Sequence, residues 1–469
     1  MWSVNADYGK IKAAITYRGG KEGTWLPFGP IGDHPLSGNS FVKADYDGMI
    51  SDLKDYSRTI RENTSATVFD VKELLAQTLE AWREDKKRLK EIILGCFPEF
   101  ERNRIENLIK ERYWADVSAG EIFGEKCPLI DDEKYEFGIR PVKAMPRVAD
   151  LGHMTSEGFI AGNMSSWSRS RENLIMNVII ENHPTFIDNM NVVANLDGEA
   201  YLAGSDIVNI NEDTLAIGVG SYSTKKAATE ISKALPDKKV YVVKKYPEHL
   251  MSHSWVDHYG ERLNYMFNMI DRDKALIQPY IFDYPTGSRK VLMNMLQTLS
   301  DDLYRWEPVR KESDFQEENW AEIPDRVKPR IKSRVYGSLS KERLKGFDGV
   351  GSVEVLEDGK SKSKNSSFVD QLIEDAVLSP ENIILVGGDP NDVEYRNEYE
   401  HWITSIREGG WACALTVLKP GVVMSYHDMV KTNEILEYNG VEVIEKDARY
   451  VKMIHETGLG SFVLPLWRV

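Results

Sequence analysis

Beyond about residue 140, short apolar runs alternate with amphipathic helical segments, and this alternation constrains the fold more than any other feature of the sequence. The runs are bounded by Gly, Asp and Asn, as in DTLAIGVG at 213–220. Segments 168–184 and 366–378 carry apolar residues three and four positions apart, the spacing of a helix with one buried face. Strand runs placed between such helices predict an α/β protein.

The first 140 residues contain more predicted helix than strand. Segment 10–18 has the period-two character of a strand, and 66–71 (ATVFDV) predicts another short strand. Between them, 45–62 has helical spacing. From 72 to 115, apolar positions three and four apart predict one continuous helix, with Pro98 as the single breaker.

Two further segments carry local turn or loop signals. Within 191–210, the dipeptide Asp197-Gly198 separates two apolar runs, which predicts a hairpin with a type I′ turn. The segment EDGKSKSKNSS at 357–367 is polar and rich in Ser and Lys, which predicts an exposed loop.

The composition fits a globular protein and excludes several functional classes. Apolar residues make up 42% and charged residues 28% of the 469 residues, with no apolar run of membrane-spanning length. The first twenty residues lack the layout of a signal peptide, so we expect a cytoplasmic protein with no membrane partner. A net charge of −15 repels polyanions, so we expect no nucleic-acid partner.

No spacing of cysteines or histidines predicts a metal centre or a disulfide framework. The cysteines are too few and too scattered for either: Cys96, Cys127 and Cys413. Three histidines lie four and five positions apart, without a cysteine or a compact acidic cluster beside them: His249, His253 and His258. We therefore expect no metal and no cofactor. Phosphate-binding loops and the G-x-S-x-G nucleophile motif are also absent.

The stretch LAGSDIVNINEDTLAIGVGSYST at 202–224 resembles the arginine deiminases, which belong to the guanidine-modifying (pentein) superfamily. That family writes this segment as E-G-G-D, a strand, N-E-D-T-L-A-I-G-V, and a loop. Further matches follow the family's order along the chain: ADYGKIKAAITYRGG at 6–20, RSRENLIMNVIIENHPTF at 169–186, RLNYMFNMIDRD at 262–273, PGVVMSYHDMVKTNEILEYNGVEVI at 420–444 and GLGSFVLPLWR at 458–468.

The resemblance implies a fold and an assembly. The family's fold is a five-bladed, pseudo-symmetric α/β propeller in which ββαβ-type modules surround a central polar site. Residues 1–71 and 141–469 would form the propeller, and residues 72–140 would form a helical insertion. Because the family makes homo-dimers, we expect a homo-dimer or a higher homo-oligomer.

The resemblance also implies that the catalytic groups of the family are replaced. In these enzymes a cysteine thiolate attacks the guanidinium carbon, a histidine transfers protons, two acidic residues hold the guanidinium, and arginines bind the substrate carboxylate. The matched positions here are Ser461 for the cysteine, Arg262 for the histidine, Asn264 for the aspartate of the same motif, Ala203 for the glutamate of E-G-G-D, and Tyr222 and Glu456 for two arginines. A serine hydroxyl needs a base, and an arginine cannot accept a proton, so this mechanism is not available.

Three matched positions keep residues that suit a cationic or zwitterionic ligand. Asp206 is the fourth residue of the E-G-G-D match, and Arg169 opens the R-x-R-E helix. An ungapped count back from Arg169 places Asp150 on the guanidinium-binding aspartate. Structural roles are the alternatives for Asp206, at a strand-end turn, and for Arg169, at a helix start.

Two hypotheses follow. In the first, the protein is a non-catalytic binding or regulatory protein for a guanidino or amino-acid-like small molecule, contacted by Asp150, Arg169, Asp206, Tyr222, Arg262 and Ser461. In the second, the pocket belongs to a re-tooled hydrolase or amidinotransferase-like enzyme for a different, anionic or amino-acid-derived substrate, with His455 and Glu456 among its groups. Mutual pairing of Arg262, Tyr222 and Glu456 favours the first, and side chains that converge on open space favour the second.

Overall fold

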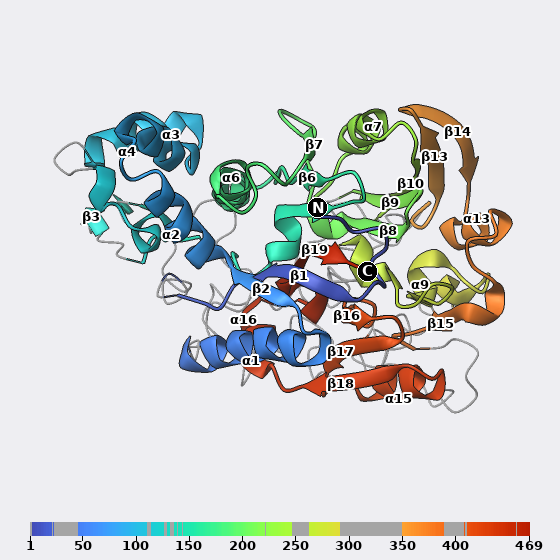
Figure 1. Ribbon diagram of the computed structural model, residues 1–469. Coiled ribbons are helices and arrows are strands. Elements are labelled where there is room, and N and C mark those ends of the chain that lie inside the picture. Colours follow the sequence, from blue (N-terminus) through green and yellow to red (C-terminus); the bar gives the residue numbers. More distant parts are fainter. Residues whose placement is uncertain are drawn as a thin grey trace, which may run out of the picture.

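The computed structural model shows a mixed α/β protein (Figure 1). The structure describes residues 2–20, 22, 46–109, 114–125, 129–131, 136–137, 139–142, 144–220, 222–245, 262–290, 349–388, 408, 410–455 and 457–469. Five residues discussed above lie outside these ranges: Cys127, His249, His253, His258 and Glu456. None of the helices in the described ranges is both long and apolar enough to cross a membrane.

Within these ranges, five three-stranded units share one pattern: an antiparallel pair, and a third strand parallel to the second. The units are β5 (Gly152–Met154), β6 (Phe159–Ala161) and β7 (Val192–Asn195); β8 (Ile207–Asn211), β9 (Thr214–Val219) and β10 (Lys239–Lys244); β11 (Phe267–Met269), β12 (Ala275–Ile277) and β15 (Ile383–Leu385); β16 (Thr416–Lys419), β17 (Val422–Tyr426) and β18 (Glu442–Lys446); and β19 (Leu464–Arg468), β1 (Ile11–Thr16) and β2 (Thr67–Asp70).

The last of these units joins the two ends of the chain. Strand β19 pairs with β1, and the Lys10 backbone N–H donates to the Val469 carbonyl at 2.7 Å. Both termini therefore belong to the same sheet.

Helices connect the parallel strands, as crossover connections require. They are α1 (Tyr46–Thr64), α6 (Trp167–Asn182), α7 (Lys225–Ala234), α13 (Phe368–Glu374) and α15 (Val430–Tyr438). Figure 1 shows α1, α7, α13 and α15 at the periphery, outside the strands. Each buries an apolar face. In α7, for example, Thr224 caps the first turn and Ile231 is fully buried. Strands β1 and β2 and helix α1 confirm the predictions for 10–18, 66–71 and 45–62.

The prediction of one continuous helix over 72–115 is wrong. The segment contains α2 (Val71–Ala81), α3 (Lys86–Gly95) and α4 (Glu99–Ile109), and α5 (Ala119–Phe123) follows them. Asp85 starts α3 by accepting a hydrogen bond from the Arg88 backbone N–H at 3.0 Å. Since N-caps define helix starts, this aspartate interrupts a spacing that would otherwise continue. Figure 1 shows these helices gathered on one side of the molecule.

The predicted hairpin at 191–210 is also wrong. Strand β7 runs parallel to β6, whereas β8 pairs with β9, so the two runs belong to different sheets. Asp197 and Gly198 do form a turn, in which the Ala200 N–H donates to the Asp197 carbonyl. The Asp-Gly dipeptide therefore predicted the turn correctly, but β7 pairs with β6 and β8 pairs with β9.

A hairpin occurs instead where an exposed loop was predicted. Strands β13 (Val353–Glu357) and β14 (Lys360–Asn365) pair across Asp358 and Gly359, which both have positive φ as a type I′ turn requires. Strand β14 is the edge of the sheet that contains β8, β9 and β10. Its lysines and serines are exposed. Charged residues on an edge strand hinder its pairing with a strand of another chain.

Candidate functional site

Asp150 is the centre of a buried ionic cluster. It lies in the 3₁₀ helix η3 (Val148–Leu151), immediately before β5, and its exposed fraction is 2%. Arg169, in the first turn of α6, donates from Nη1 to Asp150 Oδ2 at 2.6 Å. The Ser205 hydroxyl, from the 3₁₀ helix η4 (Gly204–Asp206), donates to Asp150 Oδ1. One carboxylate thus joins three separate elements.

Arg262 places a second guanidinium on the same carboxylate. Its Nε donates to Asp150 Oδ1 at 3.1 Å, and its Nη2 donates to Oδ2 at 3.4 Å. The guanidinium carbon lies 3.5 Å from the centre of the Tyr222 ring, a close cation–π contact. Only 2% of Arg262 is exposed, so its charge is satisfied inside the protein. Arg262 is the N-cap residue of the short helix α8 (Leu263–Met266).

Opposite charges surround Asp150, and the Arg147 guanidinium acts on it as well. Burial by itself would raise the pKa of Asp150, but the charges of Arg262 and Arg169 outweigh burial and hold that pKa well below its ordinary value. Glu172, one turn after Arg169 on α6, accepts from Arg169 Nε at 2.9 Å. Burial raises the pKa of Glu172, and the Arg169 charge partly offsets this effect. Two carboxyl groups therefore accept hydrogen bonds from two guanidinium groups, and the charge of a third acts on Asp150.

Asp206 forms a separate buried ion pair. Lys245 Nζ donates to its Oδ1 at 2.6 Å, and both side chains are fully buried. The Leu263 backbone N–H also donates to Oδ1 at 2.9 Å, and the Ser223 hydroxyl donates to Oδ2 at 2.6 Å. Because Leu263 is the first residue of α8, Asp206 positions the backbone beside Arg262. This geometry gives Asp206 a structural role.

Ser461 lies in a cluster of hydroxyl groups. It belongs to the 3₁₀ helix η10 (Leu459–Phe462) and is 2% exposed. Its Oγ accepts from Thr457 Oγ1 at 2.7 Å and lies 3.4 Å from the Tyr265 hydroxyl. In the described part of the chain, no carboxylate or imidazole contacts Ser461, so no base there can take its proton.

Among the remaining matched positions, Ala203 and Asn264 lie in the described part of the chain and Glu456 lies outside it. Ala203 is fully buried, and its backbone N–H donates to the Ser223 hydroxyl at 3.1 Å. The Asn264 Oδ1 is buried without a hydrogen-bond partner among the described residues. His455 ends α16 (Arg449–His455), and its side chain lies outside the described set. Cys413 is fully buried, and burial raises its pKa well above the ordinary value, as expected for a small apolar residue rather than a nucleophile.

The structure thus joins four predicted site residues in one network and leaves two in neighbouring networks. Asp150 contacts Arg169 and Arg262, and Arg262 in turn contacts Tyr222. Asp206 and Ser461 have their own partners. The elements that carry them pack together: η3 contacts both η4 and η10, and η4 contacts α8.

Sequence reasoning missed six side-chain partners in these networks: Glu172, Ser205, Ser223, Lys245, Tyr265 and Thr457. Two of them had a signal. Glu172 follows Arg169 by three residues on a predicted helix, where opposite charges face one another. Lys245 is the first residue after β10, two positions beyond its apolar run, and a lysine that stays buried there requires a carboxylate.

Known proteins place this chain in a family. The arginine deiminase family model matches residues 55–318, more than half of the chain. The chain belongs to the arginine deiminase family. Arginine deiminase of Latilactobacillus sakei is 24% identical over 297 residues, covering 59% of this chain and 69% of the relative. Arginine deiminase of Bacillus cytotoxicus is 22% identical over 461 residues, covering 94% and 92%.

Two solved structures align with most of the length of this arginine deiminase family member. Unliganded AgrE aligns with 97% of this chain and 39% of its own, at 10% identity and a TM-score of 0.48. DDAH from Pseudomonas aeruginosa, a mutant in complex with citrulline, aligns with 97% of this chain and 99% of its own, at 11% identity and a TM-score of 0.42. TM-scores below 0.5 do not by themselves establish a common fold.

Proposed function

We propose that this protein is a non-catalytic member of the arginine deiminase family, a small-molecule-binding or regulatory protein without the deiminase chemistry. The proposal rests on the buried Arg262 guanidinium. It donates two hydrogen bonds to Asp150 and forms a cation–π contact with the Tyr222 ring. By the resemblance, Asp150 occupies the position of the guanidinium-binding aspartate and Arg262 the position of the catalytic histidine. The chain's own guanidinium would therefore take the place of the substrate's.

The hydrogen bonds around Ser461 support the same proposal. Attack by a serine requires a neighbouring base, and its recorded partners are the hydroxyls of Thr457 and Tyr265. Asp150 is ionised but already accepts from two guanidinium groups. Loss of the nucleophile or the base alone costs on the order of a millionfold in rate where these residues act as a unit.

The chemistry of the cluster also suggests the ligand class. A group that competes with Arg262 for Asp150 and Tyr222 must be cationic, planar and able to donate two hydrogen bonds. We therefore propose a guanidino or amino-acid-like ligand held by Asp150, Arg169 and Tyr222. Asp206 would support the backbone beside Arg262, and Ser461 would stay in the neighbouring hydroxyl cluster. Entry of the ligand would require the Arg262 side chain to swing away from Asp150.

The wider architecture remains part of the proposal. We propose a five-bladed α/β propeller formed by residues 1–71 and 141–469, and the five repeated three-stranded units support it. Residues 72–140 would form the helical insertion. A cytoplasmic location and a homo-dimeric or larger assembly are proposals that rest on the sequence and on the family.

The direct test is turnover of L-arginine, followed as citrulline by mass spectrometry. The arginine deiminase of Latilactobacillus sakei serves as the positive control. We expect no citrulline from this protein, and none from its Ser461→Cys variant, because a restored thiol still lacks a base. Citrulline formed by the unmodified protein and abolished by Ser461→Ala would contradict the proposal and favour a re-tooled enzyme.

A further inference from the structure

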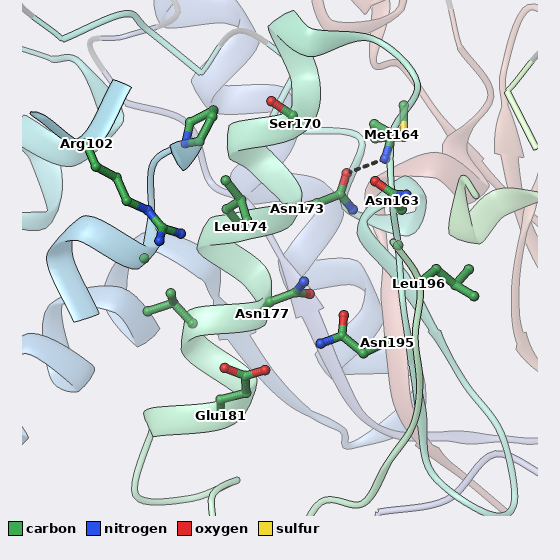
Figure 2. A pocket seen from close by; sticks show the side chains of 14 residues that line it. Arg102, Asn163, Met164, Ser170, Asn173, Leu174, Asn177, Glu181, Asn195 and Leu196 are labelled. Carbon is green, nitrogen blue, oxygen red and sulfur yellow. Dashed lines mark hydrogen bonds between the residues drawn. The ribbon is translucent and has the colours of Figure 1, made fainter. Parts of the chain in front are cut away.

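A groove on helix α6 lies apart from the Asp150 cluster. It has a volume of about 330 Å³, within the range of pockets that hold small metabolites. Figure 2 looks onto α6, with Arg102 of α4 on one side and Asn163 and Asn195 on the other. The face of α6 between them carries the half-buried Asn177 and the exposed Glu181. We call this feature the α6 groove.

Two charged side chains at the α6 groove have no ionic partner among the described residues. Arg102 donates from Nε to the Phe97 carbonyl at 3.1 Å, and its two terminal nitrogens donate to no residue that the structure describes. Glu181 is exposed on the last turn of α6. In the described part of the chain, no ion pair joins Arg102 or Glu181 to any other residue, or to each other. Because the Arg102 guanidinium and the Glu181 carboxylate line the same groove without forming an ion pair, a zwitterionic molecule could bind between them.

An amide oxygen between these charges is also unsatisfied. The Asn177 Oδ1 is buried, and no described residue donates a hydrogen bond to it. Asn173, one turn earlier, shows the contrast: it accepts from the Met164 backbone N–H at 3.2 Å and donates to the Leu151 carbonyl at 3.1 Å. Asn173 is therefore part of the wall. Asn177 extends toward Asn195 in Figure 2. Its oxygen can accept a hydrogen bond that no described residue supplies.

The arrangement of these groups defines the chemistry of an occupant. Asn177 and Glu181 are four residues apart on α6, so one donor group can reach both. Both are acceptors, which suits an ammonium group. Arg102, on the other wall, offers two parallel N–H donors, the pattern that binds a carboxylate. Neighbouring Leu174 and Val178 supply apolar surface for a short aliphatic part.

We propose that the α6 groove binds a free amino acid, with its carboxylate on Arg102 and its ammonium group on Asn177 Oδ1 and Glu181. The site is independent of the Asp150 cluster and needs no movement of Arg262. The two are mechanically linked, however, because Arg169 and Glu172 lie on the other side of the same helix. A bound amino acid would therefore hold the helix that contacts Asp150.

The experiment uses the full chain and the twenty common L-amino acids. Each is screened by thermal unfolding at millimolar concentration, and calorimetry then gives the Kd of those that raise the melting temperature. Decarboxylated and N-acetylated analogues of each hit test the two charged ends. The variants are Arg102→Gln, Glu181→Gln and Asn177→Leu. Arg83→Gln and Glu80→Gln, an exposed pair on α2 and just after it, are the matched controls.

We expect at least one amino acid to bind, and Arg102→Gln to raise its Kd about tenfold while leaving the Kd of the decarboxylated analogue unchanged. Glu181→Gln is likewise expected to raise the Kd of the amino acid about tenfold, while leaving the Kd of the N-acetylated analogue unchanged. Asn177→Leu weakens binding yet raises the melting temperature of the ligand-free protein, because it removes an unpaired buried oxygen. That combination distinguishes a ligand contact from a general loss of folding.

Three outcomes would overturn the proposal. The first is that no amino acid raises the melting temperature. The second is an affinity that the groove variants and the control variants change equally. The third is binding that Tyr222→Leu abolishes and the groove variants leave intact, which would place the ligand in the Asp150 cluster instead.

Discussion

The Lys245–Asp206 ion pair is predicted to be among the strongest stabilising contacts near the site. Both side chains are fully buried and lie 2.6 Å apart, so neither charge can recover hydration when its partner is removed. Breaking a pair of this kind costs about 3–5 kcal/mol. Asp206 would keep two hydrogen bonds, from Leu263 N and Ser223 Oγ, so we expect Lys245→Met to cost about 3 kcal/mol.

A double-mutant cycle isolates the pair from other losses. The free energy of unfolding is measured by urea denaturation, followed by tryptophan fluorescence, for Lys245→Met, Asp206→Asn and the double variant. After one charge is removed, the other is buried without an ionic partner, and removing it as well abolishes that energetic cost. We therefore expect the double variant to lose at least 1 kcal/mol less than the sum of the single losses.

Additive losses would refute this reasoning, because they would mean that the two charges do not sense each other. Lys226→Met offers a matched control. This lysine lies 4.0 Å from Glu230 in an exposed i,i+4 pair, and its loss should cost no more than about 0.5 kcal/mol.

Three further predictions concern burial. Burial raises the pKa of Glu22 to about 7 despite its lysine partner. The protonated group therefore favours the folded state below pH 4.5, and this contribution is lost as the pH rises to 7. In urea titrations the unmodified protein should lose about 3 kcal/mol more stability across this interval than Glu22→Gln. Gly218→Ala should cost about 1–3 kcal/mol in the same assay, because the added methyl group would lie 2.7 Å from Lys245 Cδ. Cys96 and Cys413 should resist iodoacetamide at pH 8 until the protein unfolds, as peptide mass spectrometry would detect, because burial raises both thiol pKa values.

The sequence predicted the elements of the fold better than their pairing. Apolar spacing identified β1, β2, α1 and α6, since each depends mainly on one buried face. The Asp-Gly signal at 197–198 was read as a hairpin, while the same dipeptide at 358–359 was missed within a polar segment. A turn dipeptide specifies a bend, but the strands on either side pair only if no other strand competes for them.

The candidate site was predictable as a set of positions but not as a set of contacts. Order along the chain picked out Asp150, Arg169 and Arg262, which the structure joins. It could not reveal that Arg262 lies on Asp150, because this contact spans 112 residues and depends on how η3 and α8 pack. The buried partner Lys245 was missed because lysine is ordinarily a surface residue.

The central claim is that Arg262 holds its own guanidinium where the family holds a substrate. Thermal unfolding of Arg262→Gly in guanidinium or methylguanidinium chloride at about 10 mM tests it most directly, with equal sodium chloride and urea as controls. We predict that the variant melts at a lower temperature than the unmodified protein, and that either guanidinium salt restores several degrees while the controls do not. In the unmodified protein either salt must first displace Arg262 from Asp150, so it should raise the melting temperature far less than in the variant. An identical response of the two proteins to all four additives would contradict the claim.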